Sequence, residues 1–287
     1  MIRAASHIHS DWSYDGKWPL PRLAAEFARR GCRVLMMTEH DRGFTESRRQ
    51  EHRAACAGAS SQDLLVVPGI EYSDADNIVH VLVWGPVPFL GEGISTSELL
   101  KAVKAADGVA VLAHPSRRQA WKVFDPAWAD DLLGMEVWNR KADGWAPSRT
   151  APPLMQGTKL LQFVGVDCHD RNQMFPLAME LDTRSEVTEE SVVDCLRVGR
   201  CRPTAFGRPI QEVAGGLTGA TLKWAERCRR SAASSFTIAA ILGVLTWSSV
   251  GSFRNSIYGP SRWPVSSCRL ALPRHMPPAA QRVHVPR

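Results

Sequence analysis

The sequence lacks the cysteine pattern of a disulfide-linked protein. Its seven cysteines are dispersed along the chain, and none of them forms a Cys-x-x-Cys pair. An odd, dispersed set argues against a disulfide framework and favours a reducing compartment. The residues that follow Met1 also lack the apolar stretch of a secretory signal. We therefore expect a cytoplasmic protein rather than a secreted one.

A long apolar run is also missing. Residues 231–253 carry no charged side chain, but their strongly apolar centre extends only from Phe236 to Trp247. About 20 apolar residues are needed to cross a bilayer, and shorter runs are more often buried or interfacial helices. Two interpretations stay open, a packed helix or a single anchor that makes membrane contact and tethers the chain to the inner face of a membrane.

Positive charge is scarce in most of the chain, although the formal net charge is +6. Residues 1–207 hold 24 Lys and Arg against 27 Asp and Glu, whereas residues 208–287 hold 11 against 2. The first part has neither the basic stripe nor the aromatic series that nucleic-acid grooves present. We therefore assign the basic character to the tail and expect a small partner molecule rather than a nucleic acid.

Short apolar runs alternate with amphipathic stretches up to about residue 204. Apolar runs bounded by polar or turn-forming residues are typical of buried strands. Residues 77–84 predict an extra strand beside the third one. The other predicted strands follow Met1 directly or lie at residues 33–37, 64–67, 109–112, 134–138, 160–166 and 177–181.

Helices are expected between these strands. One ends at Gly31, and another runs from a capping residue at Ser95 to Gly108. Repeated alternation of strands and helices is typical of an α/β fold with a parallel sheet, either open or closed into a barrel. We expect this domain to cover residues 1–207. Residues 208–287 form a basic, partly apolar tail, and its Pro- and Arg-rich end is predicted to be disordered.

Histidines and carboxylates gather at the ends of the predicted strands, where barrel enzymes place their chemistry. His-x-His on a strand puts both imidazoles on one side, because side chains alternate along a strand. Imidazole and carboxylate ligands without thiolates suit Zn²⁺, Mn²⁺ or Fe²⁺. So many candidate ligands indicate a cluster of two or three ions. The candidates are His7, His9, Asp15, His40, Glu71, His80, His114, Asp167 and His169.

The order of these motifs resembles that of the PHP family (polymerase and histidinol phosphatase domain) over residues 1–207. The resemblance implies a distorted (β/α)7 TIM-like barrel, a trinuclear metal site and a metal-dependent phosphoesterase activity. All nine ligand positions of the family are filled. The motifs are His7-x-His9, Asp15-Gly16, Glu39-His40-Asp41, Gly69-x-Glu71, His80, His114-Pro115 and Asp167-x-His169.

The resemblance also implies which residues bind each metal. The first ion is expected to be held by His7, His9, Glu71 and Asp167. Glu71 is expected to bridge to a second ion, which His80 and His114 also bind. The third ion is expected to be held by Asp15, His40 and His169. A metal-activated water then attacks phosphorus, and Glu71, Asp167 and His169 are predicted to act in catalysis.

Phosphate recognition calls for guanidinium groups. Arg117 and Arg118 follow the His114 motif, and Arg171 follows the motif that ends at His169. These three arginines are therefore predicted to bind the phosphate of a small phosphorylated substrate, either a phosphomonoester or a small phosphodiester.

Three alternatives stay open. A nuclease acting on nucleic-acid ends is one, although the slightly acidic domain disfavours it. An amidohydrolase barrel also begins with His-x-His, but it usually needs a metal-bridging lysine at a strand end, and Glu71 stands in that place. A metal cluster with a purely structural role is the third, and the full set of ligands favours catalysis over it. The identity of the ester and of the metal is left open by the sequence.

Overall fold

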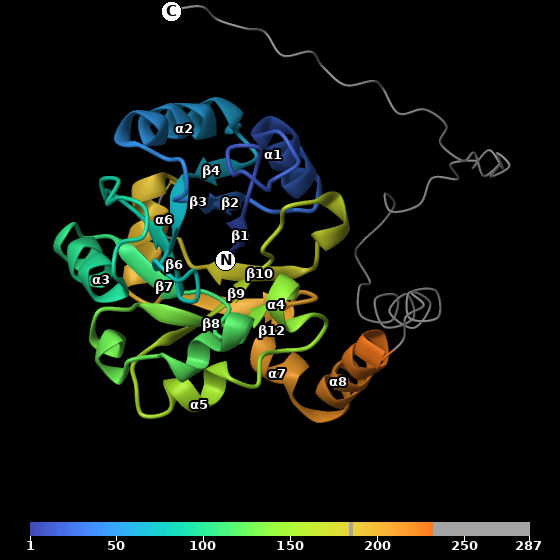
Figure 1. Ribbon diagram of the computed structural model, residues 1–287. Helices are drawn as coiled ribbons and strands as arrows, with labels where there is room; N and C mark the ends of the chain where they lie inside the picture. The colour runs from blue at the N-terminus through green and yellow to red at the C-terminus, as the bar shows by residue number, and fades with distance from the viewer. Residues whose placement is uncertain (184–185, 232–287) are drawn as a thin grey trace, which may run out of the picture. The chain divides into compact units, whose positions relative to one another are not determined.

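The computed structural model describes residues 1–183 and 186–231 (Figure 1). Strands and helices alternate along the chain as expected. The strands are β1 (Ile2–Ile8), β2 (Val34–Met37), β3 (Glu39–His40), β4 (Leu65–Val67), β5 (Gly69–Ser73), β6 (His80–Trp84), β7 (Val109–Leu112), β8 (Gly134–Asn139), β9 (Leu161–Gly165), β10 (Leu177–Leu181), β11 (Cys201–Ala205) and β12 (Arg208–Pro209).

The helices are α1 (Leu20–Arg29), α2 (Glu46–Ala59), α3 (Thr96–Ala105), α4 (Arg140–Asp143), α5 (Ala151–Met155), α6 (Glu189–Arg197), α7 (Ile210–Ala214) and α8 (Gly216–Ser231). Short 3₁₀ turns form η1 (Arg117–Lys122), η2 (Pro126–Asp130) and η3 (Arg171–Gln173). Gly31, just beyond α1, takes the left-handed conformation with φ 79°, which confirms the predicted helix end. Ser95 caps α3 as predicted, but that helix ends at Ala105 instead of Gly108.

The strands form two six-stranded sheets, ordered β12-β11-β10-β1-β2-β4 and β3-β5-β6-β7-β8-β9. The predicted parallel sheet is confirmed only in part, because β6 and β10 run antiparallel to both of their neighbours. Residues 74–79 alone connect β5 to β6, and so short a connection joins only antiparallel strands. The extra strand predicted beside the third one is therefore β6, and it lies inside its sheet.

The two sheets are connected at three places. A single residue separates β2 from β3, and another separates β4 from β5, so the chain passes twice from the first sheet to the second. Beyond β9, the amide of Val166 donates to the carbonyl of Ser6 at 3.0 Å. The amide of His9 donates to the carbonyl of Cys168, also at 3.0 Å. The result is a mixed α/β fold in which β1 and β9 end side by side; the ladders by themselves do not establish the predicted barrel.

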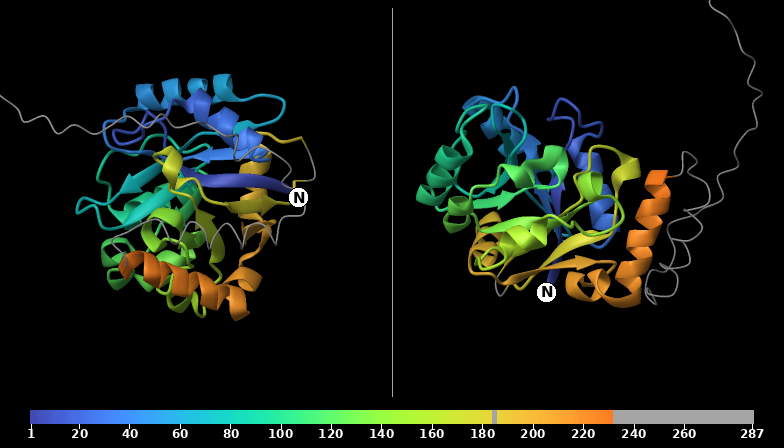
Figure 2. Two further views of the ribbon diagram at one scale, coloured as in Figure 1. Left: turned by 90° about the vertical axis from the view of Figure 1, so that its right-hand side faces the viewer. Right: turned by 60° about the horizontal axis from the view of Figure 1, so that its bottom comes forward.

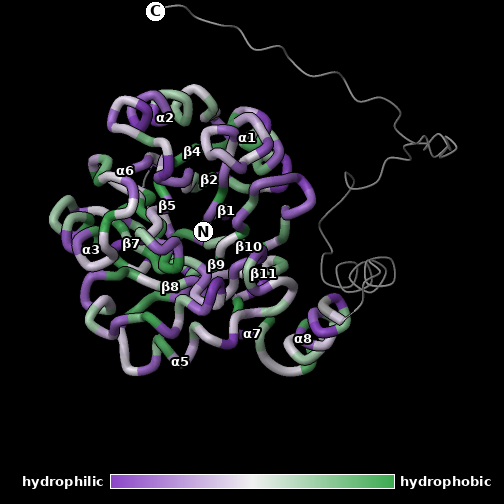
Figure 3. The backbone as a smooth tube through the Cα atoms, viewed as in Figure 1, coloured by the Kyte–Doolittle hydropathy of each residue, from purple (hydrophilic) through white to green (hydrophobic). Residues whose placement is uncertain are grey.

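The hydrophobic core lies in the strands and on the helix faces that cover them. Figure 3 shows hydrophobic residues gathered in the strands and hydrophilic ones mostly in helices and loops. In α1, Leu20, Leu23 and Phe27 are buried at helical spacing, so one face of the helix packs inward. α3 and α6 also bury one face each. α3 packs against β7, and α6 packs against β7 and β10.

Residues 208–231 pack against the rest of the fold. β12 pairs with β11, and Ile210, Val213 and Leu222 of α7 and α8 are buried in the core. Figure 2 shows these two helices in orange, beside the rest of the fold. The described residues beyond 207 belong to the same compact unit as residues 1–207. The predicted domain boundary after residue 207 stays a prediction.

The uncharged segment predicted as a possible membrane contact begins at Ser231, and its remaining residues, like the predicted disordered end, lie outside the described part of the chain. Within residues 1–183 and 186–231, no helix is long and apolar enough to cross a membrane.

Candidate metal centre

The nine residues predicted to bind metal lie at or near the ends of neighbouring strands. Eight of them are buried, and the side chain of Asp15 is 34% exposed. β6 pairs its first residue, His80, with the last residue of β5, so the reversed strand still delivers its histidine to the same end. The nine lie in β1 (His7), just beyond it (His9 and Asp15), in β3 (His40), in β5 (Glu71), at the start of β6 (His80), beyond β7 (His114) and beyond β9 (Asp167 and His169).

Glu71 lies at the middle of this group. One of its oxygens, Oε1, is 2.7 Å from His80 Nδ1, 3.0 Å from His114 Nε2 and 3.4 Å from His7 Nε2. The other, Oε2, is 3.0 Å from His40 Nδ1 and 3.3 Å from His9 Nε2. A single carboxylate therefore faces ring nitrogens of five histidines, and its two oxygens face different ones.

Two further carboxylates complete the group. Asp167 Oδ1 is 3.3 Å from His169 Nδ1 and 3.7 Å from Nε2 of both His7 and His9. Asp15 lies on the outer side, with Oδ2 3.1 Å from His169 Nε2 and Oδ1 3.4 Å from His40 Nε2. All nine predicted ligands are thus joined to one another through three carboxylates.

The ligand atoms fall into four overlapping triplets, and the atoms of each triplet lie within 4.8 Å of one another. Glu71, His80 and His114 form the set expected for the second ion. His9 belongs to two triplets, one with His40 and His169 and one with His7 and Glu71. It therefore joins the set expected for the first ion to the set expected for the third. The triplets are His7–His9–Glu71, Glu71–His80–His114, His9–His40–His169 and His7–His114–Asp167.

Several ligand atoms have no hydrogen-bond partner, which is a direct test of whether the residues fit a metal. Among the described residues, six buried side-chain nitrogen or oxygen atoms lack a hydrogen bond. Four of them belong to predicted ligands: His7 Nε2, His9 Nε2, Asp15 Oδ1 and His114 Nδ1. The first three of these lie 3.3 to 3.4 Å from an oppositely charged group without making a hydrogen bond to it. A buried polar atom without a partner is costly. Three imidazole nitrogens and a carboxylate oxygen are donors that Zn²⁺, Mn²⁺ or Fe²⁺ accept. The residues therefore fit a multi-metal site.

The histidine pKa values differ sharply across the group. Burial acts to lower the pKa of His40, but Glu71 and Asp15 outweigh it and raise that pKa to about 10. Burial also acts on His9, and the neighbouring rings of His40 and His169 add to it, so the pKa of His9 lies well below its ordinary value. Burial acts to lower the pKa of His7 as well, but Glu136, Asp167 and Glu71 outweigh it and raise that pKa well above its ordinary value. Histidines must be neutral to bind metal, so ions entering this site would displace protons from His7 and His40.

Three of the ligands have strained backbones. His7, His114 and Asp167 have positive φ angles of 61°, 25° and 52°, in or near the left-handed region that residues other than glycine rarely adopt. Such strain costs on the order of 1–3 kcal/mol per residue and tends to occur at functional sites. The same three residues form one of the triplets. The chain therefore turns sharply at the ends of three strands to aim these side chains at one point.

Glu136 is a functional residue that the sequence did not reveal. It lies in β8, is fully buried, and its Oε1 is 2.8 Å from His7 Nδ1. Its Oε2 accepts a hydrogen bond from the backbone amide of His114 at 2.8 Å. A carboxylate behind a ligating histidine fixes which ring nitrogen carries the proton. Glu136 thus leaves His7 Nε2 free to face the centre. Its only sequence signal is an acidic residue inside an apolar strand.

Glu39 supports two other predicted ligands, His9 and His40, through Ser13. Its carboxylate accepts hydrogen bonds from the hydroxyl groups of Ser10 and Ser13, each at 2.5 Å. The Ser13 oxygen is in turn 3.3 Å from His9 Nδ1 and accepts the amide of His40 at 3.0 Å. The Glu-His-Asp motif therefore contributes a ligand and, one residue earlier, a buried group that holds two ligands in position.

The three predicted phosphate-binding arginines differ in position. Arg117 lies beside the group, with Nη1 3.0 Å from His80 Nε2 and 3.1 Å from the carbonyl oxygen of Asn77. Arg118 is exposed and donates to the same carbonyl. Arg171 is exposed at the start of η3, and in the described part of the chain no hydrogen bond joins it to a ligand. Arg117 is thus the arginine of the three that touches a predicted ligand.

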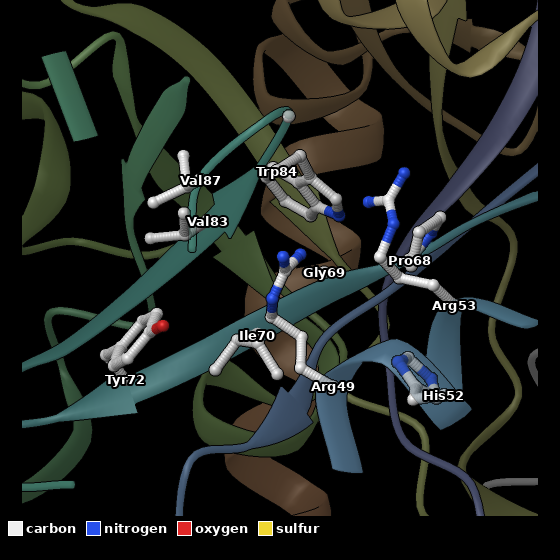
Figure 4. A pocket seen from close by; sticks show the side chains of 11 residues that line it. Arg49, His52, Arg53, Pro68, Gly69, Ile70, Tyr72, Val83, Trp84 and Val87 are labelled. Carbon is white, nitrogen blue, oxygen red and sulfur yellow. The ribbon is translucent and has the colours of Figure 1, made fainter. Parts of the chain in front are cut away.

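A small cavity lies on the face of β5 that is opposite to the Glu71 side chain (Figure 4). Its volume is about 20 Å³, enough for about one water molecule. Ile70 and Tyr72 line it, and because side chains alternate along a strand, Glu71 between them points away from it. Arg49 and Arg53, which also line it, are paired with Glu46 and Glu189. The cavity is therefore separate from the metal centre.

No family model matches the chain. An uncharacterized protein of Methanocaldococcus jannaschii is 25% identical over 150 residues, which are 48% of this chain and 82% of that protein.

Two solved structures have a similar fold. One is a two-domain protein from Bacteroides vulgatus described as containing a predicted PHP-like metal-dependent phosphoesterase. Its TM-score is 0.55 at 16% identity, and the match covers 71% of this chain and 64% of that one, so this chain spans less than two thirds of it. PsfC from Pseudomonas syringae has a TM-score of 0.53 at 13% identity over 78% of this chain and 99% of that one.

Sequence identities this low show a similar fold and nothing about function. Together with the buried histidine and carboxylate groups, they confirm the resemblance found in the motifs: the chain is similar in fold to a protein described as containing a PHP-like metal-dependent phosphoesterase, and it carries groups of residues at its strand ends that could hold metal ions.

Proposed function

We propose that the protein is a PHP-type metal-dependent phosphoesterase that hydrolyses a small phosphomonoester or phosphodiester. The observation that carries this proposal is the carboxylate of Glu71 surrounded by five histidines, with unpartnered nitrogens on His7, His9 and His114. Such a donor set, buried at the ends of strands, has little structural purpose without cations. Two or three ions of Mn²⁺, Zn²⁺ or Fe²⁺ are the expected occupants.

The strands that surround the site are proposed to form the distorted seven-stranded barrel. The seven positions are β1, β2 with β3, β4 with β5, β6, β7, β8 and β9. The bonds between Val166 and Ser6 and between His9 and Cys168 support closure of this ring, because they join its last strand to its first. A closed ring places seven strand ends around one point, which accounts for ligands that come from so many strands.

Divalent ions bound at such a centre supply an activated water and neutralise the charge that develops on the phosphoryl oxygens. The chain's own residues do the remaining work. Glu71 faces His7, His80 and His114 with one oxygen and His9 and His40 with the other, which suits a bridging role. Asp167 and His169 are proposed to act close to the reacting phosphate, and Arg117 is proposed to bind it. Glu136 and Glu39 keep the histidines from rotating.

Hydrolysis of a panel of phosphomonoesters, small phosphodiesters and oligonucleotides tests the proposal. The purified chain is assayed with Mn²⁺, Zn²⁺ or Fe²⁺ and with a chelator. We expect metal-dependent phosphate release that Asp167→Ala abolishes and that Asp130→Ala, at an exposed position in η2, leaves unchanged. A protein that binds two or three metals per chain yet hydrolyses none of these esters would point to the structural role instead. Release of nucleotides alone would favour the nuclease.

A further inference from the structure

Lys141 is a cation at the metal centre that no motif predicted. It follows β8 as the second residue of the short helix α4. Its Nζ is 3.1 Å from His169 Nε2, 3.3 Å from His169 Nδ1 and 3.6 Å from Asp167 Oδ1. The side chain is 42% exposed, so a molecule arriving from solvent can reach it. In the described part of the chain, Asp167 is the acid within ion-pair distance of Lys141.

The backbone that carries Lys141 is tied to the ligand framework. Asn139 caps α4, and its side-chain oxygen accepts the amide of Lys141 at 3.0 Å. The side-chain nitrogen of Asn139 donates to Glu136 Oε2 at 2.9 Å. Glu136 also holds His7. The start of α4 is therefore held in position by the same buried carboxylate that orients a predicted metal ligand.

A second link joins α4 to the turn that carries Arg117. The hydroxyl group of Ser116, one residue before Arg117, donates to Asp143 Oδ1 at 2.6 Å. The other oxygen of Asp143 accepts the amide of Asn139 at 2.8 Å. Arg117 touches His80 of the second predicted ligand set, and Lys141 touches His169 of the third. The segments that carry the two cations are thus joined by hydrogen bonds through Asp143.

The charge balance at the centre explains why Lys141 is available to a substrate. The predicted ligands include three carboxylates, Asp15, Glu71 and Asp167, whose charge two or three divalent ions would more than neutralise. Asp167 would then no longer need Lys141 as its counter-ion. A half-exposed ammonium group beside a cationic site attracts an anion.

We propose that Lys141 and Arg117 form a two-cation clamp that binds the phosphoryl group of the substrate and selects a terminal phosphomonoester over a phosphodiester. This proposal rests on the proposed phosphoesterase function and adds to it the class of ester that the protein would hydrolyse. A phosphomonoester carries a charge of about −1.5 to −2 at neutral pH, whereas a diester carries one negative charge. Two fixed cations favour the more highly charged group, and an ammonium group suits phosphate as a point charge.

Binding of inorganic phosphate to the metal-loaded full chain, measured by titration calorimetry, tests the clamp. Lys141→Met is expected to weaken phosphate binding about tenfold or more, the size expected for loss of a charge-assisted hydrogen bond. It should lower kcat/KM for a monoester more than for a diester of the same alcohol, and metal content should stay unchanged. Lys141→Arg, which keeps the charge, should restore most of the binding. Lys159→Met, at an exposed position before β9, is the matched control.

Unchanged phosphate binding in Lys141→Met would overturn the clamp. If metal binding became tighter at the same time, Lys141 would be only a counter-ion of Asp167. Equal losses for monoester and diester would overturn the selectivity. A wild-type protein that hydrolyses no ester but loses phosphate binding in Lys141→Met would refute the phosphoesterase function and leave the anion site standing.

Discussion

At the scale of single residues, Glu136 shows how much a metal ligand depends on the group behind it. Its carboxylate accepts the Nδ1 proton of His7 at 2.8 Å. Glu136→Gln keeps the size of the side chain and removes its charge. We expect metal affinity to fall about tenfold to hundredfold, the usual effect of losing such a partner. Competition with a coloured chelator measures this affinity.

Glu180→Gln is the matched control for that change, because Glu180 lies in β10 and pairs with Arg202 away from the metal centre. It should bind metal like the wild-type protein. Equal metal affinity in Glu136→Gln and wild type would show that His7 needs no partner to hold its orientation.

His40 links stability to pH when the metal has been removed. Its pKa is raised to about 10 in the folded chain, above the ordinary value of 6.5. A raised histidine pKa adds stability that is complete below the unfolded pKa and is lost as pH rises toward the folded pKa. We therefore expect the free energy of unfolding of chelator-treated protein, measured with urea, to fall between about pH 7 and about pH 8.5.

The variant His40→Gln removes this linkage. Its free energy of unfolding should fall less over the same pH interval than that of the wild-type protein, although the raised pKa of His7 leaves some dependence in place. Identical pH dependence in the two proteins would mean that Glu71 and Asp15 do not hold a proton on His40.

At the scale of secondary-structure elements, the metal centre depends on close contact between β8, β9 and β1. Gly165, the last residue of β9, has no room for a side chain, because a Cβ there would overlap Glu136 Oε1 and press on the Cβ of His7. Gly165→Ala is expected to displace Glu136, to weaken metal binding and to cost about 1–3 kcal/mol of stability, the usual effect of overpacking. Thermal unfolding with and without metal measures both effects.

Gly58→Ala provides the contrast. Gly58 lies in α2, and a Cβ there would meet nothing within 4 Å. This change should leave metal binding alone and stabilise the helix by up to about 1 kcal/mol. If the two alanine variants behaved alike, the tight contact at Gly165 would have no consequence for the centre.

At the scale of the whole molecule, the region after residue 207 raises the question of where the folded domain ends. Ile210, Val213 and Leu222 are buried, and the carboxylate of Glu226 in α8 accepts the amide of Trp145 at 3.0 Å. Burying an aliphatic side chain contributes about 1.5–3 kcal/mol. A chain that ends after Gly207 should therefore lose roughly 5 kcal/mol of stability, even though the sequence predicted a boundary there.

A chain that ends after Ser231 keeps these contacts and is the control. We expect its urea-unfolding midpoint to match that of the full chain, and we expect the midpoint of the chain ending at Gly207 to be clearly lower. Equal midpoints for all three would support the predicted boundary and would make the packing of α7 and α8 dispensable.

The sequence by itself determined which candidate ligands gather at the strand ends. Strand periodicity predicted that His7 and His9 face the same side, and both face Glu71, although His9 lies just beyond β1. Apolar runs mark the strand ends where the candidate ligands gather. These are local properties, readable within a few residues. The same local signals predicted the cap at Ser95 and the end of α1 at Gly31.

Tertiary structure alone decided how these local pieces combine. Glu136 is 129 residues away from His7 along the chain, yet their side chains touch, and no local pattern encodes such a pairing. The reversed direction of β6 depends on which strand lies beside it, and Lys141 reaches His169 because α4 packs at the end of β8. Burial of a charged group becomes favourable only when distant segments supply its partners. For that reason the candidate ligands could be identified from the sequence, whereas the residues that hold and surround them could not.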